Sequence, residues 1–497
     1  MQRDSAPKAN PESFPSAVWP FAALAFSAVV YFPVTRNYFY LDDFLNLYRI
    51  ANGPPIEYLL APHGGHMLIV RNAVFWATDK LCGPNPTFFY CTSFATHILN
   101  VYLLFRLLRL FGIDVPLASL GTALWGASPF NEGTLGWYSA FGQILVVTIS
   151  LAILMHIQLL IVRGRIPNAR IEWLWTGLAL LGAMSFGTGI VFGLLLPVVL
   201  LLLFPNHYSW RRPPLMRLVI LIPVIYYGTH LLYMRMTEVD VIIRPPWGAM
   251  LANLIGLAGL SLNLACIGVS SLLLGYWFLP LASVAAVWYA IGTVFGVSVA
   301  VVVSRAPKTT QRWICACGII ILGCYGLIAV ARAFIIRWSS LGSADYARWH
   351  YFTQLLLAVV LCLALTRAMT RLGKPLIGVL VGIWYAVAVV GYVSIAPNID
   401  NHEDSRQLTQ EALGRIRAAI HSAPASAPIV IPNGGFRPMM LVTRASFPGL
   451  AGVFVIFYPS NSTDGRRIFF VERDPAVIQS MSRGERTSTL FVTPGSG

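Results

Sequence analysis

The strongest constraint on this chain is a series of apolar runs, each about 20 residues long, that recur from Ala17 to Ala396. A helix needs about 20 predominantly apolar residues to cross the hydrocarbon core of a bilayer. Hydrophobic residues make up 57% of the sequence and charged residues 11%, which excludes an ordinary soluble domain. The sequence therefore predicts a polytopic, all-α bundle that lies in a membrane.

We expect about eleven spans within residues 1–396, the predicted transmembrane domain. The region 250–276 is predicted to be an additional re-entrant or interfacial segment, because two ordinary spans there would place later cations on the outer side. An amphipathic outer loop at about 35–87 separates the first two spans. The predicted spans are 17–34, 88–108, 115–130, 141–162, 173–186, 189–204, 218–234, 281–303, 313–334, 352–365 and 376–395.

The net charge of +15 is explained by cations that gather between the apolar runs, so no nucleic-acid partner is expected. Basic residues at 106–109, 163–170 and 211–217 fall on one side, and the positive-inside tendency makes that side cytoplasmic. The N-terminus is then cytoplasmic and the loop 35–87 external. We expect a multi-pass protein of the inner (plasma) membrane.

The C-terminal region, residues 397–497, has a different character. The spacing of apolar residues predicts a helix over 400–421, followed by strands at 429–431, 453–458, 467–471 and 487–492. About 100 residues suffice for a small α/β domain. We expect this domain to be extracytoplasmic, since it follows an odd number of spans.

An adjacent acidic pair, Asp42-Asp43, follows the first span among large apolar side chains. Acids are scarce, 20 in 497 residues, and carboxylates near hydrocarbon usually mark a functional site. Neighbouring carboxylates raise one another's pKa, so either could act as a general base, a metal ligand or both. Alternatively, the pair caps a helix that begins at Phe44.

Four further residues share the predicted outer side. His66 and Arg71, in the outer loop, are suited to binding phosphate or metal, although they could instead contact lipid headgroups. Glu132, after the third span, is expected near the acidic pair, or else caps a helix. Gln143 could supply amide hydrogen bonds in the mouth of the bundle.

The string Arg348-Trp349-His350-Tyr351 immediately precedes a late span. Aromatic residues at such a position form an interfacial belt in any membrane protein. That belt does not explain Arg348 and His350, because extra cations are disfavoured on the outer side. A guanidinium there is well suited to the phosphate of a lipid-linked substrate.

Together these motifs resemble the polytopic glycosyltransferases of the C type (GT-C), which include protein O-mannosyltransferases and aminoarabinose transferases. The resemblance rests on the acidic pair after the first span, His66 in the outer loop, Glu132 after the third span, and the string from Arg348. Many relatives carry a Lys-Glu pair near the start of the sixth span, where this chain has Phe186-Gly187-Thr188-Gly189. Any role of that pair in donor binding must therefore be absent from this chain or be performed by other residues.

The resemblance implies transfer of a sugar from a polyprenyl-phosphate-linked donor to an envelope glycan, lipid or protein on the outer face. It implies that Asp42 or Asp43 orients or deprotonates the acceptor hydroxyl. The implied donor-binding residues are Arg348, His350, His66 and Arg71, with Glu132 and Gln143 in supporting positions. A divalent cation, Mg²⁺ or Mn²⁺, held by Asp42, Asp43 and Glu132 could share the electrostatic work.

Two other functions fit the same pattern. A transporter or flippase of lipid-linked sugars would also have many spans and a phosphate-binding arginine, but it would typically show repeated halves, and no clear repeat is present. A non-catalytic subunit of an envelope polysaccharide assembly would use the C-terminal domain as its contact surface. A donor-transfer assay discriminates among the three.

Overall fold

The computed structural model describes most of residues 18–395 and four short strands beyond them. The described ranges are 18–39, 43, 46–47, 49–50, 54–63, 66–208, 213–237, 254–332, 344–369, 373–395, 429–431, 453–454, 467–471 and 488–493. Up to residue 395 the fold is an all-α bundle, with only a two-residue hairpin of strands added to it. Asp42 lies outside the described residues.

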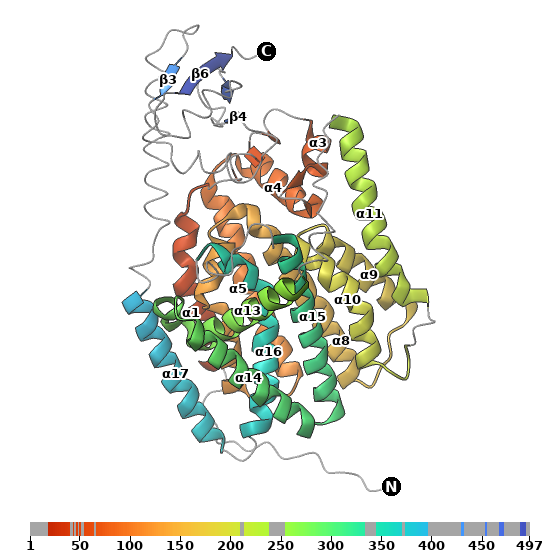
Figure 1. Cartoon of the computed structure of the whole chain (residues 1–497), viewed down its shortest axis with the longest axis vertical. Helices are drawn as coiled ribbons and strands as arrows, with labels where there is room; N and C mark the ends of the chain where they lie inside the picture. The colour runs from red at the N-terminus through yellow and green to blue at the C-terminus, as the bar shows by residue number, and fades with distance from the viewer. Residues whose placement is uncertain are drawn as a thin grey trace.

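Within the described ranges, nine helices are long and apolar enough to cross a membrane. This establishes the multi-pass membrane architecture that the apolar runs predict (Figure 1). The nine are α1 (Val18–Tyr31, continued by the 3-10 helix η1 at Phe32–Arg36), α5 (Pro86–Leu110), α8 (Phe141–Val162), α11 (Pro213–Thr237), α13 (Leu254–Leu274), α14 (Ala285–Arg305), α15 (Lys308–Arg332), α16 (Tyr351–Ala368) and α17 (Lys374–Ile395).

Three of the predicted spans are short helices. They are α6 (Val115–Gly126), α9 (Ala169–Ala183) and α10 (Gly187–Leu203), with 12, 15 and 17 residues. At about 1.5 Å per residue, α6 extends about 18 Å, against about 30 Å of hydrocarbon. Helix α6 is therefore shorter than the span predicted at 115–130, whereas α9 and α10 have about the lengths of the two short spans predicted at 173–186 and 189–204. One cause is Pro129, which cannot continue α6 because it lacks an N–H.

The two ends of the bundle differ in charge. A ring contact of 4.9 Å between Phe111 and Trp313 joins the end of α5 to the start of α15. Cys362 Sγ lies 3.6 Å from the carbonyl oxygen of Leu117, joining the last turns of α16 to the start of α6. We call the end of the bundle that contains these two contacts the basic end. Its described cations include Arg106, Arg109, Arg163, Arg165, Arg170, Arg217, Arg305, Lys308, Arg312 and Arg367.

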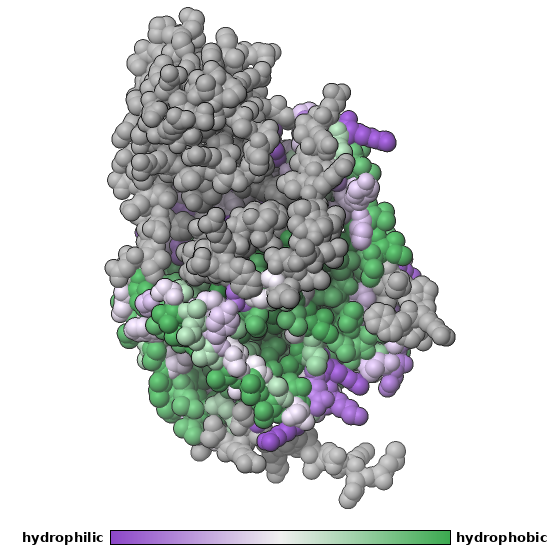
Figure 2. Space-filling view, in the orientation of Figure 1, coloured by the Kyte–Doolittle hydropathy of each residue, from purple (hydrophilic) through white to green (hydrophobic). Residues whose placement is uncertain are grey.

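The surface between the two ends is mainly apolar. Figure 2 shows this apolar region, with hydrophilic residues at its lower edge. Side chains on the outer faces of α14 and α17 are exposed and apolar, as expected of helices that face lipid. The exposed residues on these two helices include Val294, Val297, Ile383 and Val390.

Helix α13 lies across the opposite end, which we call the loop end. A Cβ added at Gly268 in α13 would lie 3.1 Å from Nδ1 of His350, just before α16. Beyond α13, the Phe278 ring is 5.5 Å from Phe130, which follows α6. Figure 1 shows α13 running across the bundle in front of α16. Helix α13 is continuous and is one of the nine helices long enough to cross a membrane, so the re-entrant or interfacial course expected for 250–276 stays a prediction.

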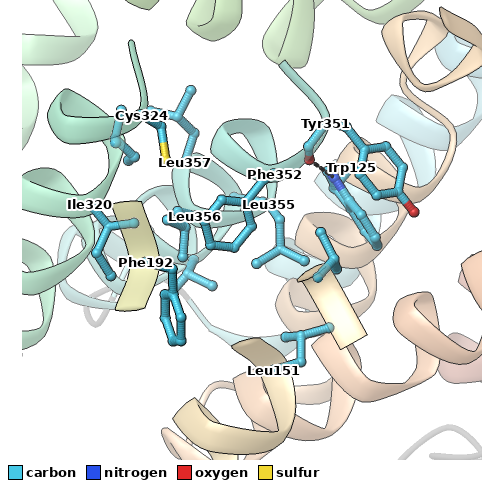
Figure 3. Packing of buried hydrophobic residues seen from close by; sticks show 14 of the residues in the cluster. Trp125, Leu151, Phe192, Ile320, Cys324, Tyr351, Phe352, Leu355, Leu356 and Leu357 are labelled. Carbon is cyan, nitrogen blue, oxygen red and sulfur yellow. Dashed lines mark hydrogen bonds between the residues drawn. The ribbon is translucent and has the colours of Figure 1, made fainter. Parts of the chain in front are cut away.

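The core of the bundle surrounds α16. Trp125 in α6 donates a hydrogen bond from its indole nitrogen to the Tyr351 carbonyl oxygen at 2.8 Å. Figure 3 shows this bond and the apolar side chains that α16 presents to its neighbours, including Phe352 and Leu355. The first turn of α16 is thereby fixed against α6, which positions the residues that precede it.

The loop end carries the short elements that connect the long helices. They are α3 (Pro55–Leu60), the antiparallel pair β1 (Pro62–His63) and β2 (His66–Met67), α4 (Ile69–Cys82), η2 (Pro129–Asn131), α7 (Glu132–Leu135), η3 (Tyr138–Ala140), η4 (Gly275–Leu281) and η6 (Ala344–His350). Most polar residues of the segment 128–139 are buried there. The short α6 therefore recesses this segment into the bundle.

Beyond the bundle, four strands pair in an antiparallel sheet of order β3-β6-β5-β4. They are β3 (Ile429–Ile431), β4 (Val453–Phe454), β5 (Arg467–Val471) and β6 (Ser488–Thr493). The helix predicted over 400–421 lies outside the described residues. A compact α/β domain in this region therefore stays a prediction.

Replacing Gly268 by alanine should destabilise the bundle. The added Cβ would lie 2.2 Å from the Tyr325 hydroxyl oxygen, which is held by His350 and Thr353 and cannot retreat freely. Overpacking of this kind costs about 1–3 kcal/mol. The midpoint of thermal unfolding in detergent should fall. Gly296→Ala on α14 is the control, since nothing lies within 4 Å of its Cβ, and equal midpoints for both variants would contradict this packing.

Candidate functional site

Asp43 is fully buried and tied to a segment almost one hundred residues away. Its Oδ1 accepts hydrogen bonds from the backbone N–H of Ser139 at 2.7 Å and from the Ser139 hydroxyl at 2.6 Å. The Tyr90 hydroxyl lies 3.3 Å from Oδ2. Asp43 therefore joins the first outer loop to η3 and to α5. Hydrogen bonds of this kind favour the charged form of a carboxylate.

Arg71 belongs to the same network. It is fully buried in α4, and its Nη1 donates to Oδ1 of Asn46 at 2.9 Å. The Asn46 amide donates to the Ser139 hydroxyl at 3.1 Å, which links Arg71 to Asp43 through two residues. The Tyr58 hydroxyl donates to the same Asn46 oxygen at 3.3 Å. Burial raises the pKa of Tyr58 well above its usual range, against the lowering effect of Arg71, so Tyr58 stays a neutral donor.

Arg348 lies against the loop that follows α6. Its guanidinium carbon is 4.9 Å from the centroid of the Trp137 ring and 5.9 Å from that of Trp349. A Cβ on Gly133 would come within 2.8 Å of the Arg348 backbone nitrogen, so only glycine permits this approach. The Thr134 hydroxyl lies 3.4 Å from the Arg348 carbonyl oxygen. The residue as a whole is half-buried.

The segment 137–139 brings these two groups together. Trp137 stacks with Arg348, and Ser139, two residues later, binds Asp43. Glu132 opens α7 in the same loop and is half-buried. Gln143 is nearly fully buried, and its Oε1 lies 3.4 Å from the Thr134 hydroxyl, which ties α8 to α7. Asp43, Glu132, Gln143 and Arg348 thus lie at one end of the bundle.

His350 has a different environment from Arg348. It is buried, its Nδ1 lies 2.9 Å from the Tyr325 hydroxyl, and its ring is 5.1 Å from that of Phe130. These contacts fasten the start of α16 to α15 and η2. A part for His350 in phosphate binding stays a prediction, and its contacts here are those of a core residue.

His66 lies at the start of α10. Its ring centroid is 5.8 Å from that of Phe186, and a Cβ on Gly187 would come within 2.9 Å of its Cε1. No side chain caps this helix, and the buried Thr188 hydroxyl has no partner among the described residues. His66 therefore faces the same short segment, 186–189, at which the chain departs from the GT-C pattern.

Two neighbouring bonds hold the His66 strand in place. The Met67 backbone N–H donates to the Tyr226 hydroxyl of α11 at 2.9 Å. The Val70 N–H donates to the Met184 carbonyl oxygen, at the end of α9, at 3.0 Å. The outer loop is thus fastened to three helices, α9, α10 and α11, on the side of His66.

Within the described ranges, no three His, Cys, Asp or Glu side chains come together as a metal site. Asp42, one of the three acids predicted to hold a cation, is outside those ranges. A Mg²⁺ or Mn²⁺ site therefore stays a prediction.

Several residues of the site were not predicted from the sequence. Ser139, Asn46, Tyr90 and Trp137 have no motif of their own, and each acquires its position from a contact distant in the chain. Asn46 offered one signal, since it lies three residues after Asp43 and so shares a helical face with it. Trp137 and Ser139 offered only their place in the short loop after the third apolar run.

Comparison with models of known protein families, with curated proteins and with solved structures finds no match. Fold and site define the class: a multi-pass helical membrane protein, with a buried polar network and a half-buried cation recessed at one end.

Proposed function

We propose that this protein is a membrane glycosyltransferase that moves a sugar from a polyprenyl-phosphate-linked donor to an envelope glycan, lipid or protein. The observation that carries the proposal is the segment 137–139, which holds Arg348 on one side and Asp43 on the other. Glycosyl transfer needs a carboxylate beside the acceptor hydroxyl and a cation beside the departing phosphate. The loop end of the bundle offers both within one short stretch of chain.

In the proposed reaction, the acceptor oxygen attacks the anomeric carbon of the sugar. The bond between that carbon and the phosphate oxygen breaks, and the lipid phosphate leaves with the bonding electrons. The hydroxyl proton passes to a carboxylate. Negative charge develops on the phosphate, where an arginine that is already in position is most effective.

We propose different roles for the two aspartates. Asp43 is fully buried and accepts two bonds from Ser139, so it is covered from an incoming acceptor hydroxyl. It is better suited to fixing the first outer loop against η3. Asp42, its neighbour in sequence, is therefore our candidate for the general base. Glu132, with the pair, is the candidate set for a divalent cation.

Two positive positions are proposed for the donor. Arg348 supplies a guanidinium, which can bind a phosphate through two parallel hydrogen bonds. His66 lies at the start of α10, which no side chain caps and where the helix dipole favours an anion. Arg348 and His66 would perform the role that the Lys-Glu pair has in the GT-C enzymes that this chain resembles. His350 is left out of the proposed set because it is buried and bonded to Tyr325.

The charge asymmetry supports the proposed orientation. The basic end would face the cytoplasm by the positive-inside tendency, so the loop end with Asp43 and Arg348 would face outward. The C-terminal domain would then be extracytoplasmic, in the inner membrane of a cell with a polymer-bearing envelope.

Proteoliposomes test the proposal. The purified full chain is mixed with a polyprenyl-phosphate sugar that is labelled in the sugar, and with envelope extract as acceptor, with and without chelator. We expect label in the acceptor and an equal amount of released polyprenyl phosphate. Label that stays on the lipid but changes leaflet would instead identify a flippase. Loss of transfer with chelator, restored by Mg²⁺ or Mn²⁺, would support the cation.

A further inference from the structure

A second polar feature lies at the basic end, far from the proposed site. Arg217 begins the membrane-facing part of α11, and its guanidinium carbon lies 4.1 Å from the centroid of the Trp173 ring in α9. This is the shortest cation–π distance among the described residues. A cation this close over an indole ring is held in one orientation.

The charge of Arg217 has no carboxylate partner within the described part of the chain. Its Nη1 is buried and has no hydrogen-bond acceptor there, while the side chain as a whole is half-buried. Glu172 is adjacent to Trp173 in sequence, but its Oε1 accepts a hydrogen bond from the Tyr208 hydroxyl at 2.9 Å. Covering part of an ionised group is costly unless a partner compensates it. The geometry therefore leaves a place for an anion from outside the described part of the chain.

The surroundings indicate what kind of anion fits. Large apolar side chains beside Arg217 and Trp173 are exposed: Leu174 at 52%, Val219 at 41% and Ile220 at 57%. A free phosphate would gain nothing from these side chains. A phospholipid would place its phosphate at the guanidinium and its acyl chains along Leu174, Val219 and Ile220. Trp173 itself is 53% exposed, as suits an indole at the headgroup level.

The other charges nearby favour a lipid with net negative charge. Arg163 and Arg165 end the α8 side of the turn to α9, and Arg170 lies three residues before Trp173 on α9. All three are exposed. Basic pockets between helices on the cytoplasmic side bind anionic headgroups in the same way.

We propose that Arg217 and Trp173, between α9 and α11, form a binding site for the phosphate of an anionic phospholipid. The site lies at the basic end and is independent of the glycosyl-transfer chemistry proposed for the loop end. Bound lipid would stabilise the packing of α11 on α9 and α10, and α11 also holds the His66 strand through Tyr226.

Thermal unfolding of the delipidated full chain in neutral detergent tests this site. Three probes are titrated: phosphatidylglycerol, phosphatidylcholine and inorganic phosphate. A ligand that binds only the folded state raises the unfolding midpoint as its concentration rises. We expect phosphatidylglycerol to raise the midpoint at concentrations at least about tenfold below those that phosphatidylcholine requires, because the quaternary ammonium of phosphatidylcholine offsets the charge of its phosphate and is repelled by the neighbouring arginines.

Variants of Arg217 and Trp173 test whether phosphatidylglycerol acts through this site. Arg217→Gln should raise the half-effective phosphatidylglycerol concentration by about tenfold or more, and Trp173→Leu should raise it several-fold, because the guanidinium is no longer held. Arg305→Gln is the matched control, an exposed arginine at the end of α14 that should leave the concentration unchanged. If Arg217→Gln does not fold, two measurements still test the site. They are the phosphatidylglycerol response of Trp173→Leu and native mass spectrometry of lipid bound to the wild-type chain.

Three outcomes would overturn the proposal. One is an unchanged phosphatidylglycerol response in both site variants. Another is an equal loss in Arg305→Gln, which would show a general attraction to the basic end. The third is inorganic phosphate that matches the lipid, which would show a site for a free anion.

Discussion

Arg348→Ala is expected to slow sugar transfer by about 10²–10³-fold while the protein stays folded. Removing one group that stabilises developing negative charge typically has an effect of this size. The structural loss is smaller, because a half-exposed cation–π contact contributes only about 0.5–1 kcal/mol. The rate of label transfer from the polyprenyl-phosphate donor measures the first effect, and the midpoint of thermal unfolding measures the second.

Two further variants separate the charge of Arg348 from its shape. Arg348→Lys keeps a cation but loses the planar group that stacks on Trp137, so we expect intermediate activity. Arg36→Ala removes an exposed arginine that lies over Phe32 at the end of the first span and should transfer at the wild-type rate. Wild-type activity in Arg348→Ala would exclude Arg348 from the donor site.

Asp43→Ala is expected to have the largest effect on stability. It leaves the buried N–H and hydroxyl of Ser139 without their acceptor, and each such loss costs about 1–3 kcal/mol. Asp43→Asn keeps an acceptor oxygen of the same shape and should cost less. The midpoint of thermal unfolding should therefore fall in the order wild type, Asn variant, Ala variant.

A double-mutant cycle isolates the Asp43 contact. Ser139→Ala removes one of the two donors, so its effect and that of Asp43→Ala should be strongly non-additive. Thr148→Ala in α8 is the control, because its hydroxyl bonds Asn100, and its effect should add to that of Asp43→Ala. Additive effects for Asp43 and Ser139 would contradict the network.

The apolar runs were enough to predict the multi-pass helical architecture, because the bilayer imposes the length and apolar character of each span. They were not enough to give the length of each helix. The segment 115–130 is mostly apolar, yet α6 ends at Gly126 because Pro129 and buried polar residues follow. Apolar composition predicts burial in lipid or protein alike, and only packing against α16 distinguishes the two.

The sequence predicted those residues of the candidate site whose charge is unusual for their position in a membrane protein. Arg348 stood out because a cation is unusual on the outer side of a membrane protein. The environment of Asp43 could not be predicted, because its partner Ser139 lies 96 residues away and is an ordinary residue in sequence. His350 shows the opposite difficulty, since a histidine beside Arg348 turns toward the core and bonds Tyr325.

The most direct measurement of the central claim is the transfer rate of Asp42→Asn beside Asp43→Asn, each purified and checked by thermal unfolding. If Asp42 is the base, its variant should lose about 10²–10⁴-fold in transfer of labelled sugar, with an unfolding midpoint equal to that of the wild type. Asp43→Asn should instead lower the midpoint together with the rate. Full transfer activity in both folded variants would contradict the proposed glycosyltransferase site.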